Sequence, residues 1–107
     1  MVDDAVVGDA GARTAAYDAF SKLYKGGKES SGAATRLVNV GSPAARIYGY
    51  LILRHIAPAD AQAVERTISG DEATVTVRNG CEAWQSTVGS LLKRLQKGDT
   101  IIELPKS

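Results

Sequence analysis

The stretch that decides the fold is Pro43-Ala-Ala-Arg-Ile-Tyr-Gly-Tyr-Leu-Ile-Leu-Arg-His-Ile-Ala57. It follows Ser42, so a hydroxyl N-cap is succeeded by proline at the first helical position, where the missing N–H costs nothing. Helices that are apolar nearly all round are usually buried. We therefore expect a central core helix, because its large apolar residues cover most of the circumference: Ile47, Tyr48, Leu51, Ile52, Leu53 and Ile56.

Helical spacing continues on both sides of this segment. It predicts helices from about Asp9 to Lys25, Gly32 to Val40, Pro58 to Ser69 and Glu82 to Lys97. Glycines end these patterns, and Ser30 or Ser31 is expected to cap the second of them. The residues expected to face the core are Ala16, Phe20, Leu23, Ala34, Leu37, Val38, Ala61, Val64, Ile68, Trp84, Val88, Leu91, Leu92 and Leu95.

Two short segments depart from the helical pattern. Residues 73–78 alternate and are β-branched, which predicts a strand or extended arm ending at Asn79-Gly80. Residues 100–104 are also extended in pattern. We expect them to pair with residues 74–77 as a two-stranded β patch near the C-terminus.

Length and composition favour one globular domain. The 107 residues are 44% hydrophobic and 23% charged, with Ala prominent among the apolar residues and few aromatics. Residues 1–8 show no clear period and are interpreted as a flexible lead-in, followed by a single domain over residues 9–107. The predicted class is mostly α: a compact bundle of about five helices.

The run Ser42-Pro43-Ala44-Ala45-Arg46, followed by small and large apolar residues through Leu53, resembles the second helix of a HEAT-type repeat. Residues 32–41 would be the first helix, so the resemblance covers residues 30–57. The chain departs from the pattern in having Ser42 where Asp is typical and in its short first helix. The resemblance implies a HEAT-like helical hairpin that binds other proteins without chemistry, as in small bacterial proteins that carry a single repeat.

Charge argues against general nucleic-acid binding. The formal net charge is +1, which supplies no overall attractive field. The charge is uneven, because the stretch from residue 13 to residue 54 is basic while its neighbours are acidic. Lys22, Lys25, Lys28 and Arg36 form a basic edge, which we interpret as a solvated rim because no aromatic residues are interleaved.

Cysteine content and hydropathy favour a cytoplasmic protein. The single Cys81 has no disulfide partner in the chain, and no segment reaches 18 consecutive apolar residues, so no membrane association is expected. The start of the sequence lacks the pattern of a signal peptide. A periplasmic location is the alternative if a leader has been removed.

The candidate protein-binding site is the polar stripe of the central helix, formed by Arg46, Tyr50 and Arg54. These residues stand four apart, so they share one face, and Arg and Tyr are favoured at protein interfaces. The alternative is internal: the arginines pair with Asp60 or Glu65 of the following helix, or cap carbonyls, and Tyr50 packs between them.

The sequence also permits a thiol chemistry. Cys81 lies just before a predicted helix, where backbone amides can acidify a thiol, and His55 is the one histidine that can serve as its base. Against this, no cysteine-enzyme motif surrounds either residue, so both are interpreted as structural. Catalytic residues, metal ligands and cofactors are not predicted, because acidic pairs such as Asp71-Glu72 are ordinary solvated neighbours.

The sequence therefore predicts a non-enzymatic module that binds another protein. A small bacterial inhibitor or immunity protein is one version of this hypothesis. The alternatives are a thiol-dependent enzyme using Cys81 and a self-associating structural protein.

Overall fold

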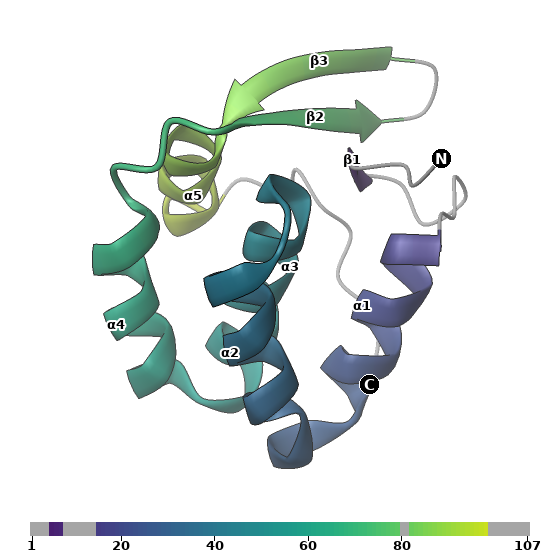
Figure 1. Cartoon of the computed structure of the whole chain (residues 1–107), viewed down its shortest axis with the longest axis vertical. Coiled ribbons are helices and arrows are strands. Elements are labelled where there is room, and N and C mark those ends of the chain that lie inside the picture. The colour runs from purple at the N-terminus through teal and green to yellow at the C-terminus, as the bar shows by residue number, and fades with distance from the viewer. Residues whose placement is uncertain (1–4, 8–14, 80–81, 99–107) are drawn as a thin grey trace.

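A computed structural model of the chain describes the backbone of residues 5–7, 15–79 and 82–98, and the side chains of residues 18–77 and 84–98. The elements, labelled in Figure 1, are β1 (Ala5–Val7), α1 (Ala15–Lys25), the 3-10 helix η1 (Gly27–Ser30), α2 (Ser31–Val40), α3 (Pro43–Ile56), α4 (Pro58–Ile68), β2 (Thr74–Asn79), β3 (Glu82–Thr87) and α5 (Val88–Gln96). The described residues thus form five α-helices and a small sheet. The predicted mostly helical class is confirmed.

Helix α3 is the centre of the structure. It packs against the other four α-helices and against strands β1 and β2. Its start is as predicted, since the Ser42 hydroxyl accepts a hydrogen bond from the Ala45 amide at 3.3 Å and Pro43 occupies the first turn. Its large side chains are nearly all buried, among them Ile47, Tyr48, Leu51, Ile52 and Leu53.

Helices α2 and α4 agree closely with the predicted spans. The helix α1 ends at Lys25 before Gly26 and Gly27, while the predicted start at Asp9 lies outside the described residues. The start of α2 differs, because η1 runs directly into it and the Ser30 side chain makes no capping hydrogen bond. Burial confirms the expected core positions Phe20, Ala34, Val38, Ala61, Ile68, Val88, Leu91, Leu92 and Leu95.

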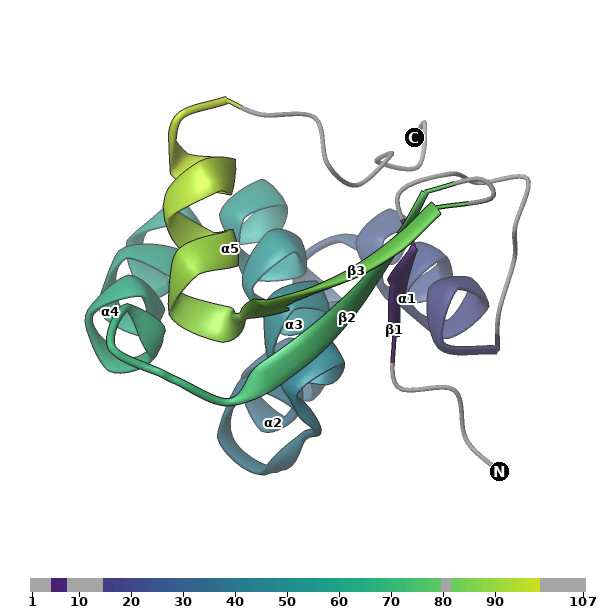
Figure 2. The same cartoon turned by 90° about the horizontal axis from the view of Figure 1, so that it is seen from above.

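The sheet has three strands in the order β1-β2-β3, one more than predicted. Strand β1 runs parallel to β2, with Ala5 opposite Thr76, so the expected lead-in contains a strand. A parallel pair needs a long crossover, and helices α1 to α4 supply it. Seen from above in Figure 2, the β2–β3 hairpin crosses over the helices. Val75 and Val77 are buried beneath it, as the alternating pattern predicts.

The predicted helix from Glu82 to Lys97 is wrong in its first half. Residues 82–87 form β3, which pairs antiparallel with β2 and sets Trp84 opposite Val77. The helix begins only at Val88, because the Thr87 hydroxyl accepts a hydrogen bond from the Ser90 amide and caps it. As a strand, residues 82–87 form backbone hydrogen bonds with β2. These bonds outweigh the helical preference that the spacing of Trp84 and Val88 indicates.

The predicted pairing partner at residues 100–104 lies outside the described residues. Within them, β2 is bonded to β1 on one side and to β3 on the other. No helix in the described part of the chain has both the length and the apolar character needed to cross a membrane.

Helices α2 and α3 approach each other most closely at Gly49. A Cβ atom there would lie 2.7 Å from the Ala34 carbonyl oxygen, 2.9 Å from Cγ2 of Val38 and 3.0 Å from Cβ of Leu37. The first neighbour is backbone and cannot turn away. The close packing of this helix pair therefore depends on the missing side chain.

Replacing Gly49 by Ala is expected to lower the free energy of unfolding by about 1–3 kcal/mol, because the two helices must separate to admit the methyl group. Denaturant unfolding followed by circular dichroism measures the change. Gly32→Ala is the matched control in α2, where a Cβ meets nothing within 4 Å. The control should be neutral or slightly stabilising, and equal losses in the two variants would contradict the packing argument.

Candidate functional site

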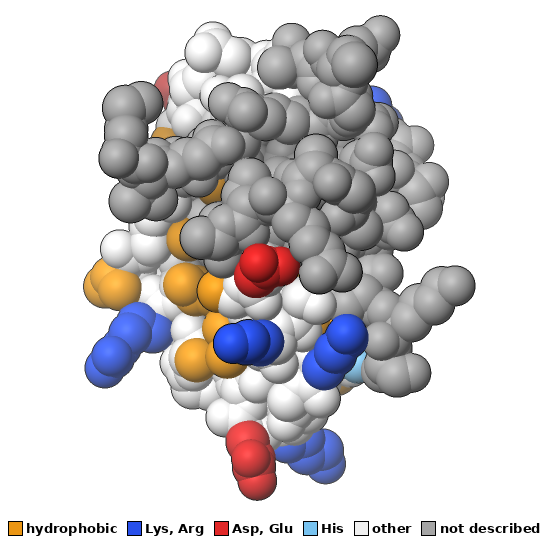
Figure 3. All heavy atoms as spheres, turned by 90° about the vertical axis from the view of Figure 1, so that its right-hand side faces the viewer, with side chains coloured by type: hydrophobic (Ala, Val, Ile, Leu, Met, Phe, Trp, Pro, Cys, Tyr) orange, Lys and Arg blue, Asp and Glu red, His pale blue; other side chains and the backbone are white. Residues whose placement is uncertain are grey.

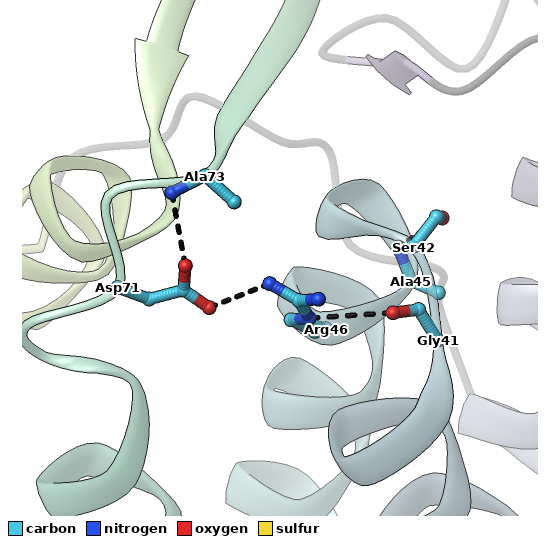
Figure 4. Close-up of polar contacts among 6 residues, drawn as sticks. All are labelled: Gly41, Ser42, Ala45, Arg46, Asp71 and Ala73. Atoms are coloured by element: carbon cyan, nitrogen blue, oxygen red, sulfur yellow. Dashed lines mark hydrogen bonds and ion pairs between the residues drawn. The ribbon is translucent and has the colours of Figure 1, made fainter.

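Arg46 joins the start of α3 to two other parts of the chain. Its Nε donates to the Gly41 carbonyl at 3.3 Å, and one terminal nitrogen lies 2.8 Å from Oδ2 of Asp71. Figure 4 shows the guanidinium between these two acceptors. The side chains are 29% and 19% exposed, so this ion pair is partly shielded from solvent.

Asp71 holds the connection between α4 and β2. Its Oδ1 accepts the Ala73 amide at 2.9 Å, and its backbone carbonyl accepts the Gly89 amide at 2.9 Å. Gly89 has room for no side chain here, since a Cβ would lie 2.4 Å from the Ser69 carbonyl oxygen. The Arg46–Asp71 pair therefore links α3, α4, β2 and the start of α5.

Tyr50 is inside the molecule, at 1% exposure. Its hydroxyl donates to Oε2 of Glu65 on α4 at 2.7 Å. Burial, followed by the hydrogen bond to Glu65 and its negative charge, raises the pKa of Tyr50 from 10.0 to about 12. This phenol therefore acts as a hydrogen-bond donor that fastens α3 to α4.

Arg54 completes the stripe with two contacts inside the chain. Its guanidinium carbon lies 5.7 Å from the centre of the Tyr50 ring, and a terminal nitrogen donates to the Leu95 carbonyl at 3.2 Å. That carbonyl is near the end of α5, where a cation also suits the helix dipole.

The three residues of the predicted binding stripe are thus brought together, but they face other parts of the chain. Tyr50 is not on the surface, so its side chain is not available to a partner. The arrangement agrees with the alternative in which the polar stripe is satisfied inside the chain. The partners differ from those expected, because Arg46 pairs with Asp71, and Glu65 accepts the hydrogen bond of Tyr50. Sequence reasoning missed Asp71 because it lies in a connection rather than on the facing helix.

His55 is exposed and lies flat against Tyr24, with ring centroids 4.1 Å apart and planes at 10°. Tyr24 in turn meets Phe20 edge-on at 5.6 Å. The histidine therefore lies at the edge of the aromatic part of the core. Cys81, its suggested partner, lies outside the described residues.

The described residues contain no group of three or more His, Cys, Asp or Glu side chains placed to hold a metal ion. Within the same part of the chain, every buried side-chain nitrogen and oxygen has a hydrogen-bond partner. The interior polar groups are thus used in holding helices together.

Two hollows open on the described surface. One, of about 370 Å³, is polar and lies where α4 leads to β2 and α5 begins, but the Val88 and Gly89 amides there donate to the Ala73 and Asp71 carbonyls. The other is largely apolar, about 540 Å³, and lies between α1 and α2. We call it the α1–α2 groove, and its lining residues are Leu23, Gly32, Ala33, Arg36 and Leu37.

Sequence reasoning missed the groove. It assigned Leu37 to the core together with Ala34 and Val38, but Leu37 is only partly buried. The signal was a second apolar spacing in the same helix, Ala33, Leu37 and Val40, at i, i+4 and i+7. Val40 is 77% exposed and is the one large hydrophobic side chain among the described residues with such exposure.

Asp71→Asn is expected to lower the free energy of unfolding by about 1–2 kcal/mol, because it removes the ion pair with Arg46 and keeps an acceptor for the Ala73 amide. Denaturant unfolding of the double-mutant cycle with Arg46→Met measures the coupling between the two residues. Glu72→Gln, at the exposed neighbouring carboxylate, is the control and should change little. A coupling of zero would mean that the pair does not stabilise the fold.

The raised pKa of Tyr50 predicts a loss of stability in alkaline solution. The folded chain holds this proton more tightly than the unfolded chain, so the stabilisation is complete below pH 10.0 and is lost as the pH rises to about 12. In Tyr50→Phe, the free energy of unfolding should fall less steeply over this interval than in the wild type. Chemical unfolding at a series of pH values checks this, and equal slopes would refute it.

Comparisons of the chain with models of protein families, with curated proteins and with solved structures gave no match. The resemblance of residues 30–57 to a HEAT-type repeat therefore stays a prediction. Any assignment of function has to be argued from the contacts and surfaces of this chain.

Proposed function

We propose that this chain is a non-enzymatic module that binds another protein. The observation that supports the proposal is the largely apolar α1–α2 groove, where Leu23 and Leu37 are only partly covered by the fold. Concave and mostly apolar surface is where proteins usually bind other molecules. The surface differs from the stripe suggested by the sequence.

The contacts of the polar side chains support the same proposal. Arg46 binds Asp71, Tyr50 binds Glu65, and His55 stacks on Tyr24. Each of these groups stabilises the fold in a way that leaves it poorly placed to act on a substrate. An inhibitor or immunity protein remains one version of the hypothesis, and an enzyme dependent on the Cys81 thiol remains its alternative.

The proposal is tested by capture and reconstitution. The tagged full chain is used to capture partners from a lysate of the organism that encodes it, and the captured protein is then purified and mixed with the chain. Sedimentation velocity should show a complex of defined stoichiometry. We expect Cys81→Ser to form the same complex, because binding needs no thiol.

Failure to form a complex from the purified components would overturn the proposal. A complex that is lost in Cys81→Ser would favour the thiol alternative. Titration of the wild-type thiol against pH separates these outcomes further, since a reactive thiolate ionises well below the ordinary pKa of about 8.5.

A further inference from the structure

The outer side of α2 carries a second apolar stripe that the core covers only in part. Ala34 and Val38 are buried against the rest of the molecule, whereas Ala33 and Val40 are exposed and Leu37 is only partly covered. One apolar stripe is enough to fasten a surface helix. Two residues of the second stripe line the α1–α2 groove: Ala33, which is exposed, and Leu37, which packs against the core but is only partly covered.

The elements that form and adjoin the groove carry four basic side chains, of which Arg36 lines the groove itself. Lys22, Lys25, Lys28 and Arg36 are all exposed, and none forms an ion pair with another described residue. On the face drawn in Figure 3, Lys and Arg side chains lie beside hydrophobic ones, together with an Asp or Glu side chain. Asp18 and Glu29 are the acidic residues that α1, η1 and α2 contribute among those with described side chains.

Local structure explains part of this charge but not all of it. Lys22 and Lys25 lie in the last turn of α1, where cations suit the helix dipole. Arg36 lies in the middle of α2 and lines the groove itself, so it has no such role. Its charge, placed beside Leu23 and Leu37, matches an anion on an apolar ligand.

The shape of the groove fits a helix. In Figure 1, α1 and α2 run in roughly opposite directions, and both pack against α3. The part of α2 that lines the groove runs from Gly32 to Leu37, which corresponds to about 9 Å, or between one and two turns of a third helix laid along it. At Gly32 a Cβ would meet nothing within 4 Å, so the groove is open at that end.

We propose that the α1–α2 groove binds an amphipathic helix of a partner protein, one whose apolar stripe is flanked by Asp and Glu. The apolar stripe of the ligand covers Ala33, Leu37 and Leu23, and its carboxylates meet Arg36 and the neighbouring lysines. This is the helix-in-groove mode of peptide recognition. The inference rests on the proposed function and names the surface and the partner chemistry.

The direct test uses three synthetic helical peptides with the same leucine stripe and with Glu, Gln or Lys at the flanking positions. Amide NMR spectra of the full chain are recorded during titration with each peptide. We expect the Glu peptide to shift the signals of the groove residues and to bind about ten-fold more tightly than the Lys peptide. The difference should shrink near 0.5 M salt, where the Debye length is below about 5 Å.

Equal affinities for the three peptides would overturn the proposal, as would shifts centred away from the groove. Absence of binding by all three would also overturn it. The peptides are stated probes, so each of these outcomes is a result on the groove itself.

Matched variants locate the site. Ala33→Glu places a carboxylate in the groove, and we expect it to weaken binding of the Glu peptide by about ten-fold. Ala63→Glu makes the same change at an exposed position of α4 and should bind like the wild type. Arg36→Glu and Arg66→Glu form a second pair of the same design. Thermal unfolding of each variant shows whether it remains folded under the binding conditions.

The same variants separate this inference from the proposed function. If a complex with a captured partner forms equally well with Ala33→Glu and with the wild type, the groove proposal fails and the binding function stands. If no complex can be reconstituted, the function fails whatever the peptides do.

The proposal would also be overturned if the groove bound a second copy of the chain or an anionic membrane. A concentration-dependent dimer in sedimentation, lost in Ala33→Glu and kept in Ala63→Glu, assigns the groove to a second copy of the chain. Co-sedimentation with phosphatidylserine vesicles that is lost in the same variant assigns it to an anionic membrane surface.

Discussion

The burial of α3 is the constraint on which the rest of the structure depends. A helix with apolar residues around most of its circumference is stable in water only when it is covered on nearly every side. Four helices and two strands cover it here. In a chain of 107 residues, this requirement places nearly every other element against α3. Each neighbouring helix needs only one apolar stripe, because α3 supplies the common surface.

Burial of most of α3 restricts the polar residues of the same helix. Arg46, Tyr50 and Arg54 cannot all reach open solvent, so each must find a partner from another element. The partners come from the α4–β2 connection, from α4 and from the end of α5. The hydrogen bonds of the polar stripe thereby fix the orientation of α4, α5 and the α4–β2 connection relative to α3. Apolar contacts alone are less directional.

The sequence was most informative where local chemistry and tertiary packing agree. Ser42 and Pro43 mark the start of α3 by capping rules alone, and Gly26-Gly27 mark the end of α1. Strand β3 was missed because Trp84 and Val88 are spaced four residues apart, as on one face of a helix. The same spacing is found where Trp84 lies in a strand and Val88 begins the next helix. Pairing with β2 decides between these two structures. The Asn79-Gly80 pair, a typical hairpin signal, was the clue to β3.

The parts that remained beyond the sequence involve distant partners. The strand β1 is three residues long and is defined by its pairing with β2, so its own sequence is too short to predict it. The role of Asp71 also depends on a distant partner, since no residue near it in the sequence predicts its ion pair with Arg46. The α1–α2 groove was missed for another reason: Leu37 packs against the core as predicted, but its side chain is only partly covered, and the spacing does not show the part left open.

The parallel pairing of β1 and β2 has a consequence for how the chain assembles. Ala5 is made before its partner Thr76, and helices α1 to α4 all lie between them in the chain. The helices can gather around α3 in the meantime, since their contacts are local in sequence and form quickly. Strand β1 can pair only after β2 has been made, and its docking closes the loop that contains helices α1 to α4.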